Sequence, residues 1–478
     1  MHYLKTITFR SLLVVALVVG LAGCDSLTEG FDQDPNAATD APGDLLLNGA
    51  MVGNLLVHEA NLARTAGIFS NQFTGADRQY SRLDVYQQVS SDYDALWSET
   101  YEGVVGDLLV VKSKARSAND RLLLGIAQVV EAHAYGTAAS LFGDIPFTEA
   151  GQGNENLNPA IDPQDVVIAS LADSLRNQAI PNIEAGGIGP GSLDIHFAGD
   201  ADSWIEVAYT LLARYELYQG NYDAALTAAE NGISSSDGNL IGPHDGTRGV
   251  NMNPYHEFIF LERAGYLTGT GSYGLELMQS RQNAKTDESV RFDYFYGVED
   301  ELDEPTEDEL NTGENGAFGA SSDMPLITFV ENQLIIAEAS LLGSAPNTQD
   351  AVDALNAARD ANGDFFGDSD LYEAYEIADF ESGGIANDGG STDASLLEEI
   401  LEEKYLSYTG NIESFTDLRR TANFIGVPTK AGADHPQRFL YAQVEVNANE
   451  NIPDPVPGTF EPTALFDVNN GSYAGDDL

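Results

Sequence analysis

Cysteine is almost absent from this sequence: the 478-residue chain holds one, Cys24. A single cysteine cannot form an internal disulfide or a cysteine-ligated metal cluster, so the fold must be held together by its core. Lysine is also scarce, with six among the 22 basic residues, against 76 acidic residues and a formal net charge of −54. A chain this acidic repels phosphate backbones, which excludes nucleic acid as a partner.

Excess carboxylate with few lysines suits a protein that works in concentrated salt, because charges are screened over only ~3 Å at 1 M salt. The alternative is a mildly acidic secreted protein from an ordinary habitat. Disorder is disfavoured, since 43% of the residues are apolar and many of them recur with a regular spacing, which is enough to build a core. We therefore expect a folded, salt-adapted (halophilic) protein.

Long apolar runs are missing beyond the first 23 residues, so the mature chain is not expected to span a membrane. Residues 1–23 hold Lys5 and Arg10, then a short apolar run, and end with Leu21-Ala22-Gly23 directly before Cys24. This order predicts a lipoprotein signal peptide, with Cys24 as the lipidated residue. The alternative is a signal peptide followed by an incidental cysteine. Several acyl chains, at about 0.8 kcal/mol per buried methylene, would hold the protein on a membrane.

Residues 24–43 are polar, and we expect them to form a flexible tether. Residues 44–478 are expected to form a single domain. In that domain apolar residues recur at three- and four-residue spacing, which predicts a mainly α fold. The expected helices cover residues 44–68, 84–115, 120–141, 163–185, 204–218, 223–233, 326–342, 350–361, 396–408 and 414–424.

The helices at 204–218 and 223–233 are separated by Gly220-Asn221-Tyr222, and small alanines follow in the second helix. This is the pattern of a tetratricopeptide-type hairpin. Similar pairs occur at 326–361 and 396–424, but they are not in tandem, so we expect the hairpins to be embedded in a larger domain. Residues 236–323 lose the periodicity and are rich in glycine, aromatics and acids, which indicates a functional, ligand-side insertion.

Motifs for catalysis are missing. The sequence has no HExxH, GxSxG or P-loop motif, and the GxGxxG match at residues 269–274 lies in an expected loop without a βαβ unit. Paired carboxylates cannot be argued in a chain with 76 acids. Residues 360–364 begin like a calcium loop, but Leu371 stands where a bidentate glutamate is needed. We expect no cofactor and no catalytic metal, although an acidic loop elsewhere could hold a structural calcium ion.

Several blocks occur in order along the mature chain. They are Phe31-Asp32-Gln33-Asp34-Pro35-Asn36, Asn71-Gln72-Phe73 with residues 75–80, Glu131-Ala132-His133-Ala134-Tyr135, residues 141–150, residues 398–405, Asp417-Leu418-Arg419-Arg420 and residues 436–441. Together with Cys24 these blocks resemble the SusD/RagB family of outer-membrane nutrient-binding lipoproteins. The net charge is much more negative than is typical of that family.

The resemblance implies a fold of tetratricopeptide-like helical hairpins packed with a loop-rich, irregular ligand-binding half. It also implies a lipoprotein on the extracellular face of the cell outer membrane. Such a protein binds a glycan or another oligomeric nutrient for a SusC-like TonB-dependent transporter and is not an enzyme. Two alternatives come from other classes, a surface glycoside hydrolase and a tetratricopeptide-type scaffold for protein partners.

Sugar binding needs aromatic faces for the apolar side of the ring and planar polar groups for the hydroxyls. By the resemblance, the segment after the first long helix contributes Asp77, Arg78, Arg82 and Trp97. The further aromatic candidates are Tyr80, Tyr86, Tyr266, Tyr273, Tyr294 and Tyr296.

Each aromatic candidate has a structural alternative. Trp97 stands at helical spacing with Tyr93 and Tyr101, which is also the pattern of a core residue. The tyrosines of residues 236–323 could pack the loops instead of contacting a ligand. Four carboxylates on adjacent turns are expected to form a solvated helix face, and they are Glu398, Glu399, Glu402 and Glu403.

Overall fold

The computed structural model describes residues 41–297 and 309–478, apart from residues 388, 431 and 433. The predicted signal peptide, Cys24 and most of the predicted tether lie outside the described residues, as do residues 298–308 of the insertion. Residues Gly43–Leu478 form one compact unit. No described helix is long and apolar enough to cross a membrane.

Helix α8 (Arg121–Phe142) is buried along most of its length. Its start is set by Asp120, whose side chain accepts a hydrogen bond from the Leu123 amide at 3.2 Å, as expected of an N-cap. Small residues let neighbouring helices come close. A Cβ on Gly136 would lie 1.9 Å from the Tyr215 hydroxyl, which donates to the Ala132 carbonyl at 2.7 Å. The sequence of α8 therefore fixes how closely α11 can pack.

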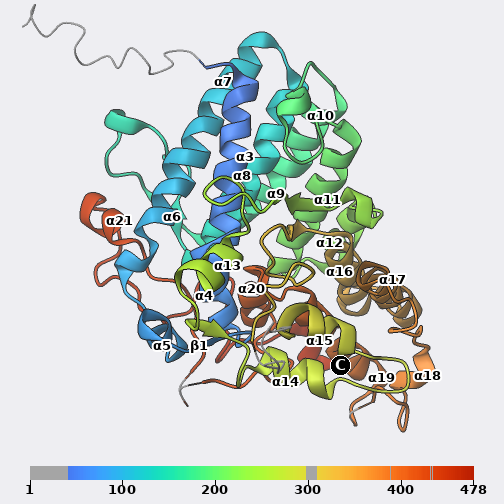
Figure 1. Ribbon diagram of the computed structural model, residues 1–478. Coiled ribbons are helices and arrows are strands. Elements are labelled where there is room, and N and C mark those ends of the chain that lie inside the picture. Colours follow the sequence, from blue (N-terminus) through green and yellow to red (C-terminus); the bar gives the residue numbers. More distant parts are fainter. Residues whose placement is uncertain (1–40, 298–308, 388, 431, 433) are drawn as a thin grey trace, which may run out of the picture. The chain divides into compact units, whose positions relative to one another are not determined.

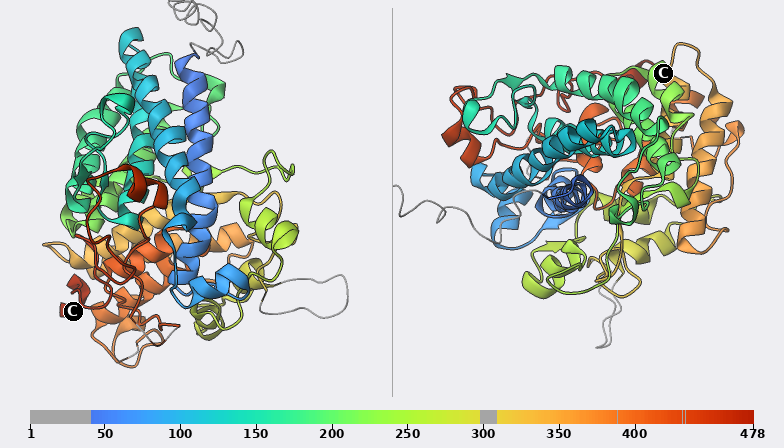
Figure 2. Two further views of the ribbon diagram at one scale, coloured as in Figure 1. Left: turned by 90° about the vertical axis from the view of Figure 1, so that its left-hand side faces the viewer. Right: turned by 90° about the horizontal axis from the view of Figure 1, so that it is seen from above.

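The helices of the N-terminal half surround α8. Helix α3 (Gly43–Glu59) lies beside α7 (Asp107–Ala118) and α8. Figures 1 and 2 show α3 in dark blue next to α7 in lighter blue. Helix α4 (Asn61–Phe69) follows α3 after a break at Ala60 (φ −96°, ψ −126°), so the helix predicted at 44–68 is two helices. The other members of this half are α5 (Arg78–Asp84), α6 (Asp94–Ser98), α9 (Gln164–Ser174) and α10 (Ile180–Glu184).

Two of the predicted hairpins are present. Helix α11 (Ala201–Tyr218) pairs with α12 (Tyr222–Ala229), and α16 (Phe329–Leu342) pairs with α17 (Thr348–Phe366). Helix α12 also packs on α16, so the hairpins are neighbours although they are far apart in sequence. The third pair differs from the prediction. Helix α19 (Thr392–Ser407) packs mainly on α16, whereas α20 (Glu413–Arg420) packs mainly against α4.

Residues 236–323 contain only short elements. They include β4 (Leu240–Gly242), α13 (Pro254–His256), β5 (Leu267–Thr268), α14 (Tyr273–Ser280) and α15 (Ser289–Tyr296). The antiparallel pairs are β4 with β6 (Met324–Ile327), β5 with β1 (Thr74–Gly75), and β2 (Ile145–Pro146) with β3 (Ile161–Asp162). The short helices α18 (Ile377–Phe380) and α21 (Gln443–Ala448) complete the described α-helices. The insertion is thus irregular, as predicted, and strands tie it to both neighbouring parts of the domain.

The prediction of a solvated face on α19 is wrong for Glu399 and Glu403, whereas Glu398 and Glu402 are partly exposed. Glu403 is 0% exposed and Glu399 is 8% exposed. Glu399 accepts from Arg281 at 2.6 Å and Glu403 accepts from Arg291 at 2.9 Å, so these carboxylates belong to an internal ionic cluster. Buried charges require such partners. Both arginines belong to residues 236–323, so the apolar periodicity of α19 alone could not predict that these glutamates are buried.

Candidate functional site

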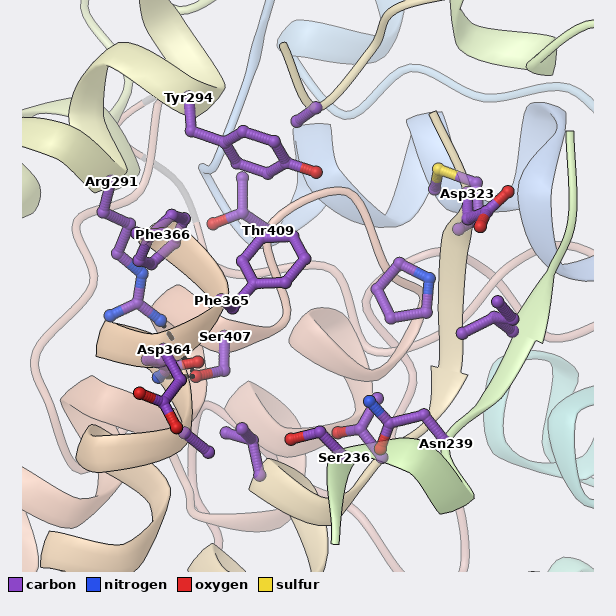
Figure 3. A pocket seen from close by; sticks show the side chains of 18 of the residues that line it. Ser236, Asn239, Arg291, Tyr294, Asp323, Asp364, Phe365, Phe366, Ser407 and Thr409 are labelled. Carbon is purple, nitrogen blue, oxygen red and sulfur yellow. Dashed lines mark hydrogen bonds between the residues drawn. The ribbon is translucent and has the colours of Figure 1, made fainter. Parts of the chain in front are cut away.

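A cavity of about 530 Å³ opens between α15, β6 and α17, and we call it the α15–α17 cavity. Residues 236–323 supply one part of its wall, and the rest comes from β6, the start of α16, α17, the end of α19 and Thr409. Its volume falls in the range of ~300–1,000 Å³ that is usual for small-ligand pockets. Figure 3 shows the side chains that line it.

An aromatic wall forms one side of the cavity. The Tyr294 ring meets the Phe365 ring edge-on, with centroids 5.4 Å apart, and Phe365 meets Phe366 at 5.2 Å. Phe365 is 65% exposed, which is unusual for a ring of this size and leaves apolar surface open to a ligand. The end of α17 explains the exposure, because two successive phenylalanines cannot both point inward from a helix.

Tyr294 carries the one polar group of this wall. Its hydroxyl forms no hydrogen bond with another described residue. Burial raises the pKa of Tyr294 to about 12, and the Asp323 carboxylate across the cavity adds to this rise. The phenol therefore stays protonated at neutral pH and can donate a hydrogen bond to a ligand.

The floor of the cavity is polar and already paired. Arg291 donates to the Ser407 hydroxyl at 2.9 Å and to Glu403 at 2.9 Å. Asn362 donates to Glu403 at 2.8 Å. These bonds fix the side chains beneath the aromatic wall, so the wall is held on a rigid base.

Polar groups occupy the opposite side. Asn239 accepts from the Phe329 amide at 2.7 Å, and Asp323 accepts from the His244 amide at 2.8 Å. Ser236 places a hydroxyl group near Asn239, whereas the Thr409 hydroxyl lies beside Tyr294 and Phe365. An aromatic wall facing amides, hydroxyls and carboxylates is suited to a ring-shaped ligand that carries many hydroxyl groups.

Tyr294 is the predicted ligand residue that lines this cavity. Asp77 and Arg78 are exposed at the start of α5, where the Asp77 side chain accepts from the Arg78 amide at 2.8 Å. Arg82 lies 3.4 Å from Asp92. The cavity lining includes none of these three residues. They lie on α5 or at its N-cap, in the N-terminal half of the domain.

Four of the predicted aromatic residues lie in the hydrophobic core. Tyr296 is 0% exposed, and Tyr80, Tyr86 and Trp97 are at most 4% exposed. Trp97 packs edge-on against Phe142 at 5.1 Å, and Tyr296 donates to the Gln72 carbonyl at 3.0 Å. All four rings are therefore core residues in this structure, with no ring face open to a ligand.

The last two predicted tyrosines are partly buried away from the cavity. Tyr273 donates to the Ile425 carbonyl at 3.2 Å, and burial raises its pKa to about 12. Tyr266 packs against Phe258, with ring centroids 6.1 Å apart. Tyr266 also lies 6.2 Å from the Tyr80 ring, so Tyr266 and Tyr273 both join the insertion to the rest of the domain.

Sequence reasoning missed Phe365, Phe366, Asp364 and Asp323. A signal for the first two was present, because adjacent phenylalanines at a helix end next to Gly367 break the amphipathic pattern. Gly367 has φ +75°, the left-handed conformation that commonly ends a helix. The stretch compared with a calcium loop, residues 360–364, is part of α17 and is helical.

Metal ligands do not gather in the described part of the chain. Among residues 41–297 and 309–478, no group of three or more His, Cys, Asp or Glu side chains is arranged to hold a metal ion.

Comparison with known proteins agrees with the fold. Residues 35–249 match a SusD-like family model described as "starch-binding associating with outer membrane". A SusD/RagB family protein from Bacteroides thetaiotaomicron has a TM-score of 0.68 at 19% identity, over 89% of this chain and 99% of that one. A chitin-binding SusD homologue from Flavobacterium johnsoniae gives 0.67 at 16% identity, over 89% and 99%. The family match over residues 35–249 and the shared helical architecture show that this chain has a SusD-like fold.

A third similar structure is a SusD homologue from Bacteroides fragilis, with a TM-score of 0.65 at 17% identity, over 91% of this chain and 99% of that one. A search of curated proteins found no match. At these identities the solved structures show a shared fold.

Proposed function

We propose that this protein binds an oligosaccharide in the α15–α17 cavity and passes it to a SusC-like TonB-dependent transporter. The observation that carries the proposal is the exposed aromatic wall of Tyr294, Phe365 and Phe366 facing polar groups across an open cavity. The SusD-like family match supports a glycan as ligand. Chitin oligomers are the first probes to use, since two similar solved structures are described as chitin-binding.

The remaining parts of the proposal concern placement in the cell. Lipidation of Cys24 would anchor the protein to the outer membrane on its extracellular face, with residues 24–43 as the tether. We propose binding without turnover because the matching family model is described as starch-binding. A surface glycoside hydrolase and a protein-binding scaffold are the competing functions.

Two experiments test the proposal. Isothermal titration calorimetry of the mature protein with a panel of neutral oligosaccharides should show binding to at least one, and the ligand should be recovered uncleaved. Affinity purification from detergent-solubilised outer membranes should recover a large TonB-dependent barrel. Cleavage of the oligosaccharide, or binding to a soluble protein in place of every glycan, would contradict the proposal.

A further inference from the structure

The α15–α17 cavity is lined by carboxylates that are not neutralised by basic side chains of the described residues. Asp237 and Asp364 line the cavity and are exposed. Their carboxylates form no hydrogen bond or ion pair with another described residue. Asp323 uses one oxygen to accept from the His244 amide at 2.8 Å, and its other oxygen accepts no hydrogen bond from the described residues.

Positive charge on the same lining is already neutralised. Arg291 is the basic residue of the described lining, and it is 1% exposed. Its guanidinium lies 2.9 Å from Glu403 and 3.6 Å from Glu288. An acidic ligand would therefore meet free carboxylates and find no free cation, which costs binding energy.

We infer that the α15–α17 cavity selects oligosaccharides bearing protonated amines over acidic ones. The inference rests on the proposed function, because it names the ligand class of the same cavity. An ammonium group is attracted to the negative face of an aromatic ring. Figure 3 places Asp364 and Asp323 on opposite sides of the hollow, with the rings of Tyr294 and Phe365 between them. An amino sugar stacked on this wall would have a carboxylate at either side.

The Asp323 carboxylate already acts on this wall. Its charge contributes to the raised pKa of Tyr294, which means that its field reaches the phenol ring. A cation placed beside the neutral phenol ring would be attracted by the same carboxylate. Because charges in direct contact are less screened than distant ones, the preference should weaken with salt but persist at moderate ionic strength.

The test compares three hexamers of matched length by isothermal titration calorimetry, made of glucosamine, N-acetylglucosamine and galacturonic acid. A pH of about 5.5 lies above the ordinary aspartate pKa of ~3.9 and below that of an amine near 8, so both charges are present. The glucosamine hexamer should bind about five-fold more tightly than the N-acetylated one. The galacturonic acid hexamer should bind more weakly than either.

Variants separate selection by the cavity from adsorption to an acidic surface. In the double variant Asp323→Asn with Asp364→Asn, the five-fold preference should fall below two-fold while the N-acetylated hexamer still binds. The matched control is Asp165→Asn, an exposed aspartate in the first turn of α9, which should keep the full preference. Phe365→Ala should weaken all hexamers.

Two results would overturn the inference alone. One is equal or weaker binding of the glucosamine hexamer in the natural protein while the N-acetylated hexamer binds. The other is a preference that survives in the double variant, since that would mean adsorption outside the cavity. Failure of all three hexamers and of every oligosaccharide in the neutral panel to bind would instead overturn the proposed function, and the inference with it.

Discussion

Aromatic side chains of this protein fall into two groups according to what their rings touch. Trp97 is enclosed by Phe142 and Tyr101 and donates to Glu445 at 3.2 Å. Phe365, in contrast, contacts other rings on one side and is 65% exposed. Burial of a large ring stabilises the fold, whereas an exposed ring contributes little to it and remains available to a ligand.

Replacing these two rings should therefore separate stability from binding. Trp97→Ala is expected to lower the free energy of unfolding by about 3–5 kcal/mol, as is usual for a large aromatic residue in a core. Phe365→Ala is expected to change it by less than about 1 kcal/mol and to weaken glycan binding. Urea unfolding and calorimetry on both variants provide the measurement, and equal stability of Trp97→Ala and the natural protein would contradict the core assignment.

The buried carboxylate of Glu403 makes a second prediction. Burial by itself would raise its pKa, but the guanidinium groups of Arg291, Arg281 and Arg359 outweigh this and lower it well below the ordinary value. A carboxyl with a lowered folded pKa stabilises the fold at pH above about 4.5, and this contribution is lost as the pH falls below that value.

Glu403→Gln should cost about 3–5 kcal/mol at pH 7, because it leaves buried arginines short of a partner. Glu402→Gln on the same helix is the matched control. Glu402 lies 3.6 Å from Arg281 with 19% of its side chain exposed, so its loss should stay within ~1 kcal/mol. Thermal unfolding of both variants measures the difference, and similar losses would show that burial of the Arg281–Glu403 cluster has little energetic effect.

The same contrast explains how far the site could be predicted. Tyr294 was predicted as a ligand residue and lines the cavity. Tyr80 and Tyr296 were predicted for the same reason, but the insertion folds back so that both rings are buried. Whether a tyrosine in an irregular segment points in or out depends on contacts with distant parts of the chain, such as Tyr296 with Gln72, and spacing carries no such information.

Helices were predicted more successfully, because their apolar periodicity is local. The hairpin α11–α12 and the capped helix α8 follow from residues within each segment. The partner of α20 does not, since its contact with α4 joins residues more than 300 positions apart, as in the 3.0 Å contact between Ser70 and Ser414. The residues within a segment therefore predict whether a helix forms, but they do not predict which distant helix it packs against.

A stacked pair of histidines joins α3 to α8. The rings of His58 and His133 have centroids 3.8 Å apart, and the second ring nitrogen of His58 lies 2.7 Å from the Thr137 hydroxyl. Burial, with a smaller effect from Arg214, lowers the pKa of His58 to about 4 against an opposing hydrogen bond to the Asn54 carbonyl. The junction therefore requires a neutral imidazole.

This junction predicts a pH dependence of stability. A histidine that stays neutral in the fold but protonates at pH ~6.5 when unfolded contributes stability that is complete above pH 6.5 and falls as the pH decreases toward 4. The loss should reach roughly 3 kcal/mol. Melting temperatures of the natural protein and His58→Gln between pH 7 and pH 4 measure it, and the variant should lose less on acidification. Parallel curves would contradict the buried neutral histidine.

At the scale of the whole molecule, nearly half of the few basic residues in the described part of the chain are buried. Nine of them are buried in the described part of the chain: Arg64, Arg214, Arg281, Arg291, Arg359, Lys404, Arg419, Arg420 and Arg438. Because the chain has 22 basic and 76 acidic residues, the surface keeps most of its carboxylates without a neighbouring cation. Such a surface repels itself unless salt screens it.

Salt should therefore stabilise the fold. We expect the melting temperature at pH 7 to rise by several degrees between 10 mM and 1 M sodium chloride, as the screening length falls from ~30 Å to ~3 Å. The effect should saturate once screening is complete. Sucrose at equal osmolality is the control for general exclusion effects. The same melting temperature in dilute buffer and in molar salt would reject the salt-adapted interpretation.

The central claim is that the α15–α17 cavity holds a glycan against its aromatic wall. A crystal structure of the mature protein soaked with the N-acetylglucosamine hexamer tests it most directly. The account predicts sugar rings stacked on Tyr294 and Phe365 with hydroxyl groups near Asn239 and Asp323. A hexamer bound with full occupancy at another surface, beside an empty α15–α17 cavity, would contradict it.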